Sequence, residues 1–346
     1  MNRAMTRALR VQWVPLLVAT VVAGVVLAFT TQHFSGSYNI FEILQTAAVD
    51  AIIGLSQMVV LAVGDMSLAV GGIGGFVTIV VGNLYQVHHW PVAFAIIGGL
   101  VAGSACGLFN GLIVAKTGLS AFIVTLATGT GFTGIAYGIT SAFPYPDVSS
   151  FLINLSKGVG FFPYLALVAL VVSFLIGAAL HWLPFGRLLL AMGGNREAAT
   201  LSGLSRQRST IIAHTLSGCL AGVAGIMYIG VLGTATPATG TDWLVVSFAV
   251  PIIGGTALVG GEASAFGCLV AAVVLATIND ALIVLNISTY AVEMAEGLLI
   301  FAAVLAGRLG QVVQRSDEGH REGLEVARSL EQGPDVGQSL GGATVK

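Results

Sequence analysis

Apolar stretches long enough to cross a lipid bilayer recur along most of the chain, as at 92–115 and 161–182. A helix needs about 20 consecutive apolar residues to span the hydrocarbon core. Hydrophobic residues make up 56% of the chain and charged residues only 9%, whereas a soluble domain carries about 25% charged residues. The chain is therefore predicted to be an all-α integral membrane protein, and we expect it to move a small solute across the bilayer.

The hydropathy pattern predicts about ten transmembrane helices, separated by short polar loops. The first follows Arg3, Arg7 and Arg10 and resembles a secretory signal, but its length and the many later spans favour a membrane helix. The third segment is short and rich in glycine, and the eighth ends in glycines. The ten segments are 11–30, 43–63, 67–82, 92–115, 119–140, 161–182, 210–232, 243–260, 264–285 and 290–307.

The distribution of basic residues predicts the orientation of the chain. With a cytoplasmic N-terminus, every lysine and arginine except Lys157 falls on the cytoplasmic side, as the positive-inside rule requires. Both termini are then cytoplasmic, which requires an even number of spans; eight spans would satisfy the rule as well as ten. We expect a cytoplasmic N-terminus at 1–10, a transmembrane domain at 11–307 with a long cytoplasmic loop at 183–209, and a disordered cytoplasmic tail at 308–346.

Two parts of the chain resemble each other. Segments 63–76 and 252–267 are both glycine-broken apolar stretches, and each is followed by a span that ends near an asparagine, Asn110 or Asn279. This similarity predicts two inverted five-helix repeats, an arrangement common in transporters, with the transport path at the repeat interface. Chance similarity between glycine-rich membrane helices is the alternative explanation.

Acidic residues inside apolar segments are candidates for function, because a charge within the hydrocarbon core is costly. Asp65 follows an apolar run, where it either caps the next helix or lines the solute path. The other acids in or near spans allow an alternative function, a secondary transporter driven by protons; they are Asp50, Glu262, Asp280, Glu293 and Glu296. Basic partners are missing from the span interiors.

The sequence does not predict an enzyme. It contains no catalytic constellation and no phosphate-binding loop with its lysine, so the chain alone is not expected to hydrolyse a nucleotide. Three cysteines lie in apolar runs without metal-ligand spacing: Cys106, Cys219 and Cys268. No metal, cofactor or nucleic-acid partner is expected.

Four motifs occur in order along the chain and resemble those of a known family. They are Asp65-Met66-Ser67-Leu68, Phe122-Ile123-Val124-Thr125-Leu126, Gly193-Gly194-Asn195-Arg196-Glu197-Ala198-Ala199 with Ser202-Gly203, and Gly254-Gly255-Thr256 with Gly260-Gly261. With them, residues 40–310 resemble the permease subunits of bacterial ABC importers of the ribose type, within the branched-chain amino acid and sugar permease group. Gly64, Ala69 and Leu119-Ser120-Ala121 depart from the family pattern, as do Glu262, Asp280 and Glu296, which leaves the solute open.

The resemblance implies a function for the chain and for its long loop. The chain would form the path for a monosaccharide, polyol or similar solute in the bacterial inner membrane. Its implied partners are a cytoplasmic ATP-binding subunit, a periplasmic solute-binding protein and a second permease copy or homologue. Residues implied to couple to the ATPase are Gly193, Gly194, Asn195, Glu197, Ala198, Ala199 and Gly203, and the candidates for the path are Asp65, Ser67, Phe122 and Thr125.

Overall fold

The structure is a computed structural model that describes residues 36–285 and the single positions Val21, Gly24, Phe34, Met294, Gly297 and Leu298. The expected first and tenth spans, the N-terminus at 1–10 and the tail at 308–346 therefore lie outside the described residues or touch them at isolated positions only. The orientation of the two termini and the disorder of the tail stay predictions.

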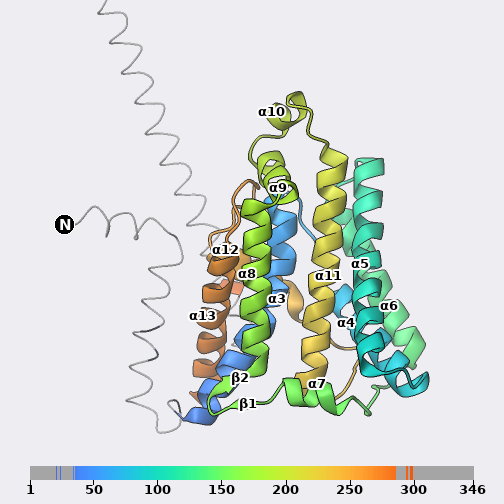
Figure 1. Cartoon of the computed structure of the whole chain (residues 1–346), viewed down its shortest axis with the longest axis vertical. Coiled ribbons are helices and arrows are strands. Elements are labelled where there is room, and N and C mark those ends of the chain that lie inside the picture. The colour runs from blue at the N-terminus through green and yellow to red at the C-terminus, as the bar shows by residue number, and fades with distance from the viewer. Residues whose placement is uncertain are drawn as a thin grey trace, which may run out of the picture. The chain divides into compact units, whose positions relative to one another are not determined.

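Between residues 36 and 285, the chain is built almost entirely from helices (Figure 1). Seven are long and apolar enough to cross a membrane: α3 (Ser37–Ala62), α4 with its π-helical end η1 (Val70–Gly82 and Asn83–Val87), α5 (Val92–Thr117), α6 (Ala121–Thr140), α8 (Tyr164–Trp182), α11 (Arg206–Leu232) and α13 (Ala265–Val284). The all-α, multi-pass membrane class is therefore confirmed. The ten-helix count and the division into two repeats stay predictions.

The remaining elements are short. The apolar helix α12 (Trp243–Ile253) falls within the predicted span 243–260 but is shorter than a full span. One end of the bundle carries α9 (Pro184–Gly194) and α10 (Arg196–Leu201), both within the predicted loop 183–209. The other end carries α7 (Ser150–Leu155) and a two-stranded antiparallel hairpin of β1 (Gly158–Val159) and β2 (Phe162–Pro163).

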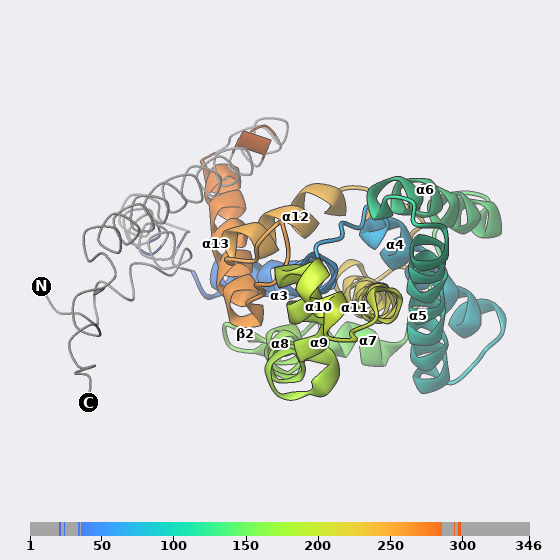
Figure 2. The same ribbon diagram turned by 90° about the horizontal axis from the view of Figure 1, so that it is seen from above.

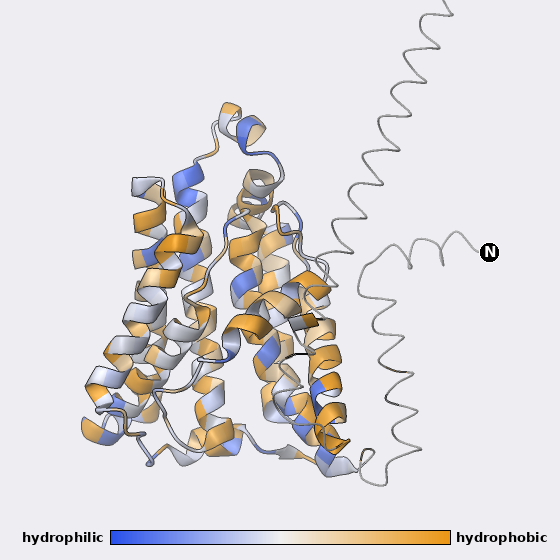
Figure 3. Cartoon of the chain, turned by 180° about the vertical axis from the view of Figure 1, so that it is seen from behind, coloured by the Kyte–Doolittle hydropathy of each residue, from blue (hydrophilic) through white to orange (hydrophobic). Residues whose placement is uncertain are grey.

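Helix α3 forms the core of the bundle. Nearly all of it is buried, and it packs against α8, α11, α12 and α13 (Figure 2). Only a small part of α5 and α6 is buried, and most of the large side chains that they expose are apolar. Strongly hydrophilic residues cluster instead at the end that carries α10 (Figure 3). A buried helix surrounded by helices with apolar outer faces is the arrangement expected when lipid is the solvent.

Glycines bring α5 and α11 into direct backbone contact. A side chain at Gly107 would overlap the carbonyl group of His214, and a Cβ atom at Gly103 would lie 2.6 Å from the carbonyl oxygen of Gly218. Gly218 in turn faces the backbone of Gly107. Membrane helices commonly associate through such small residues, because dispersion contacts and not hydrophobic burial hold them together.

Two of the predicted spans are only partly helical. Helix α4 begins at Val70, after a non-helical segment at 63–69, and α12 ends at Ile253 in a glycine-rich turn at 254–264. The expected spans 67–82 and 243–260 are therefore too long at these ends. Gly255, Gly260 and Gly261 have positive φ angles, which permit the tight turns that follow α12.

Candidate functional site

The non-helical segment at 63–69, between α3 and α4, lies inside the protein, and its backbone polar groups find partners there. With its side-chain amide oriented to match donor to acceptor, Gln57 donates to the carbonyl oxygen of Ser67 (2.9 Å) and accepts from the Ser67 N–H (3.2 Å). The N–H of Leu68 donates to Oγ1 of Thr125 on α6 (2.9 Å). Irregular backbone at membrane depth is tolerated only with such internal partners.

Asp65 connects this segment to loop 183–209 and to α11. Its Oδ1 lies 3.0 Å from Nη2 of Arg196, and its Oδ2 accepts a hydrogen bond from the Thr210 hydroxyl (3.2 Å). The same Arg196 nitrogen donates to the carbonyl oxygens of Val63 (3.2 Å) and Gly64 (3.1 Å). The Asp65 side chain is 10% exposed and that of Arg196 is 41% exposed, so the pair lies at the edge of the packed interior.

Asp65 does not cap the following helix. The N-cap of α4 is Ala69, which has no side-chain capping bond, and the Ala69 N–H is 3.3 Å from Oγ of Ser67. The predicted alternative, that Asp65 caps the following helix, is therefore wrong, because residues 66–69 separate Asp65 from the first turn of α4.

Three glycine-containing segments pack backbone to backbone beside Asp65, and we call them the glycine junction: residues 62–65, 193–196 and 259–261. The Gly261 N–H donates to the carbonyl oxygen of Ala62 (3.0 Å). A Cβ atom at Gly260 would lie 2.7 Å from the Gly64 nitrogen and 2.9 Å from Cα of Gly193. A side chain at Gly193 would overlap the backbone of Ala62. Both chain breaks of the proposed repeats thus meet loop 183–209 at one point.

The short helix α10 projects from the glycine junction. Its N-cap, Asn195, accepts a hydrogen bond from the Ala198 N–H (2.9 Å). Glu197, Ala198 and Gly203 are exposed, whereas Ala199 is buried against its own chain. Gly203 has a φ of 82° and closes the turn after the helix.

Arg196 and Leu201 were not among the residues selected from the sequence for the site. The guanidinium of Arg196 contacts Asp65 of its own chain. Leu201 is 90% exposed at the tip of α10. A large apolar residue between polar and small neighbours was the signal that could have identified Leu201.

The path candidates separate into two groups. One group lies at the non-helical segment 63–69, which contains Asp65 and Ser67 and contacts Thr125 of α6 through the N–H of Leu68. Ser67 and Thr125 are buried there. Phe122 is 47% exposed on the surface of α6. The role of all four in the path stays a prediction.

The charges of the described residues are unequal between the two ends of the bundle. Near α9 and α10 lie the basic residues Lys116, Arg187, Arg196, Arg206 and Arg208, whereas Lys157 lies at the opposite end, beside β1. Within residues 36–285, no group of three histidine, cysteine or acidic side chains could hold a metal ion.

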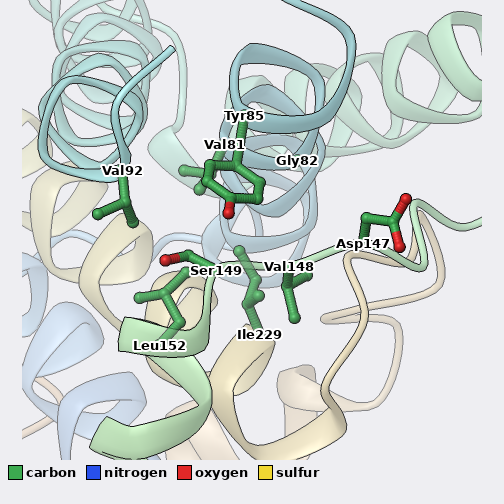
Figure 4. Close-up of a pocket in the computed structure, with 9 residues that line it drawn as sticks. All are labelled: Val81, Gly82, Tyr85, Val92, Asp147, Val148, Ser149, Leu152 and Ile229. Carbon is green, nitrogen blue, oxygen red and sulfur yellow. The ribbon is translucent and has the colours of Figure 1, made fainter. Parts of the chain in front are cut away.

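A shallow apolar pocket lies at the end of α4 that is opposite the glycine junction (Figure 4). The polar side chains in its lining are those of Tyr85, Asp147 and Ser149, and the N–H of Asp147 donates to Oε1 of Gln86 (3.3 Å). The lining residues are Val81, Gly82, Tyr85, Val92, Asp147, Val148, Ser149, Leu152 and Ile229. Its position places it at the end of the bundle that carries α7.

Known proteins resemble this chain over most of its length. It is 30% identical over 293 residues to the D-allose transport system permease protein of Escherichia coli (strain K12), covering 84% of this chain and 90% of that protein. It is also 30% identical to the ribose import permease protein of Haemophilus influenzae (84% and 91% covered) and to the L-arabinose ABC transporter permease protein of Azospirillum brasilense (81% and 82% covered).

No solved structure matches the chain. Residues 39–305 match the family described as the branched-chain amino acid transport system permease component, and this match covers most of the chain. The resemblance seen in the sequence motifs is thereby confirmed, and the chain belongs to this family of membrane permease components.

Proposed function

We propose that this chain is the permease subunit of an ABC importer and forms the membrane path for a monosaccharide or a similar polyol. Similar proteins are named as permeases for allose, ribose and arabinose. ATP hydrolysis belongs to a separate ATP-binding subunit, and a periplasmic solute-binding protein delivers the solute. We also propose a second permease copy or homologue, an inner-membrane location, and cytoplasmic N- and C-termini.

The proposed architecture is ten transmembrane helices in two inverted five-helix repeats. The two chain breaks, at 63–69 and 254–264, approach each other at Gly64 and Gly260. What supports an internal repeat is the likeness between the glycine-broken segments 63–76 and 252–267. The path candidates remain Asp65, Ser67, Phe122 and Thr125.

The observation that carries the proposal is that Arg196 of α10 hydrogen-bonds to the non-helical segment at 63–69. A projecting helix with an exposed apolar tip is suited to insertion into a partner. At the base of α10, Arg196 donates hydrogen bonds to the carbonyl oxygens of Val63 and Gly64 and to the carboxylate of Asp65. We propose that loop 183–209 transmits movements of the ATP-binding subunit to the transport path. Ala199 then supports α10 from beneath, while Glu197, Ala198 and Gly203 face the partner.

The test changes Leu201, whose side chain makes little contact with its own protein. In the full importer, Leu201→Asp is expected to reduce co-purification of the ATP-binding subunit by about tenfold or more, because a desolvated apolar anchor contributes 2 kcal/mol or more. ATP-dependent uptake of ribose, allose or arabinose should fall with it, while the amount of permease in the membrane stays unchanged.

The matched control is Val159→Asp at the opposite end of the bundle, where the valine is 71% exposed. This variant should retain the ATP-binding subunit. Normal association and normal uptake in Leu201→Asp would show that α10 is not the docking element.

A further inference from the structure

A second group of polar and aromatic side chains lies away from the glycine junction, where α3, α4, α11 and α12 approach one another. The rings of Tyr228 and Trp243 are 5.8 Å apart and nearly perpendicular, at 85°. The Trp243 ring lies against Gly74 of α4, where any side chain would overlap it. Trp243 is 3% exposed, so the absence of a side chain at Gly74 creates the space that the indole occupies.

Two carboxylates belong to the elements that meet at this aromatic pair. Asp242 immediately precedes Trp243 and is exposed. Asp50 comes from the middle of α3, which packs against both α11 and α12, and is 9% exposed. An acid halfway along a buried membrane helix is costly and is generally retained for function. The exposure of Asp242 leaves this group of residues accessible from one side.

A third, independent observation comes from the turn that leads into α12. Thr239 is 4% exposed, and its hydroxyl group has no hydrogen-bond partner among the described residues. Its backbone carbonyl lies against Gly75 of α4. Buried hydroxyl groups are nearly always hydrogen-bonded, so this hydroxyl is available to a partner beyond the described residues, such as a ligand or water.

The location also fits a binding site. The first turn of α4 and the turn before α12 contact each other through Gly71 and Gly240. Helix α12 is shorter than a full span, and transporters commonly bind their solutes beside such interrupted helices.

We propose that Asp50, Tyr228, Thr239, Asp242 and Trp243 form a binding site within the membrane for a neutral solute rich in hydroxyl groups. Carboxylates accept hydrogen bonds from several hydroxyl groups, and the threonine and tyrosine hydroxyls both donate and accept. Aromatic faces cover the apolar C–H surface of such a solute. This inference rests on the proposed transport function and adds to it the residues that contact the solute.

The test uses the full importer in proteoliposomes and measures uptake of labelled ribose, allose and arabinose together with ATP hydrolysis. Asp50→Asn and Tyr228→Phe are expected to lower uptake by about tenfold, the loss expected for one hydrogen bond to a charged or buried group. ATP hydrolysis stimulated by the binding protein should continue. Matched controls are Asp280→Asn, in another span, and Tyr137→Phe, on the exposed surface of α6.

Thr239→Val separates binding from folding, because the hydroxyl that it removes makes no bond within the described chain. Lower uptake by this variant, with unchanged thermal stability, supports the site. Uptake within about twofold of wild type in all three variants would overturn it, as would equal losses of uptake and ATP hydrolysis. A wild-type importer that takes up none of the three sugars would instead refute the proposed function. Preference for glucosamine over the neutral sugars would refute the assignment of a neutral solute.

Discussion

Replacing Arg196 with alanine should break the contacts between loop 183–209 and the non-helical segment at 63–69. One nitrogen of Arg196 makes all three contacts, with the carbonyl oxygens of Val63 and Gly64 and with Asp65. A shielded hydrogen bond to a charged group contributes about 1.5–3 kcal/mol, whereas an exposed ion pair contributes about 0–1 kcal/mol. Because the Arg196 side chain is 41% exposed, we expect its three contacts together to contribute about 1–3 kcal/mol. This free energy corresponds to a change of about 5- to 150-fold in the equilibrium between the loop with these contacts formed and the loop with them broken.

The assay is a double-mutant cycle of Arg196→Ala and Asp65→Asn, followed by thermal unfolding in detergent and by uptake relative to ATP hydrolysis. The two changes should be non-additive by about 1 kcal/mol, because each removes the same ion pair. ATP hydrolysis should continue with reduced uptake. Arg196→Lys should restore part of the effect, since a single ammonium nitrogen can approach the same three acceptors.

Arg208→Ala is the matched control, because Arg208 is exposed in the first turn of α11. It should leave stability and uptake unchanged. Additivity of the Arg196 and Asp65 changes within about 0.5 kcal/mol, or an equal effect of Arg208→Ala, would refute the reasoning.

Two further pairs of variants test the packing of the site by thermal unfolding. Gly193→Ala should destabilise the protein by about 2–3 kcal/mol, because the added methyl group overlaps backbone atoms at the glycine junction. Gly203→Ala should cost only about 1 kcal/mol for its positive φ, since the space around it is open; equal effects would contradict the junction. Thr125→Val should cost about 1–3 kcal/mol by leaving the Leu68 N–H unpaired. Thr130→Val should change stability by less than about 0.5 kcal/mol, because its exposed hydroxyl bonds only within α6; a similar loss would show that the Leu68 bond contributes nothing.

The sequence predicted most helices well because hydropathy reports directly on burial in lipid. The spans 92–115 and 119–140 correspond to α5 (Val92–Thr117) and α6 (Ala121–Thr140) within a few residues. Hydropathy reports composition and not hydrogen bonding, so it could not separate the helical part of 243–260 from the apolar turn that follows Ile253. Two glycines at 254–255 were the local signal for that helix end.

The site was only partly predictable. The motifs identified Asp65 and the glycines of loop 183–209, but no local spacing connects Asp65 with Arg196, which lies 131 positions away. Their contact follows from the packing of α3 against α11 and from the glycines that let three backbones meet. Phe122 illustrates the opposite case. It lies in the same motif as Thr125, yet Thr125 is buried and Phe122 is exposed. A linear motif cannot show on which side of a helix each of its residues lies.

A chain of contacts leads from α10 to the acidic and aromatic residues that we propose as a binding site. Any movement of Arg196 acts on Val63, Gly64 and Asp65, because its guanidinium holds their oxygens. Five residues later the chain enters α4, whose first turn contacts the turn before Asp242 through Gly71 and Gly240. The glycine contacts along this route are made by backbone atoms without intervening side chains. We expect a shift of loop 183–209 either to break the Arg196 contacts or to move the segment at 63–69, and the Arg196→Ala variant distinguishes these outcomes.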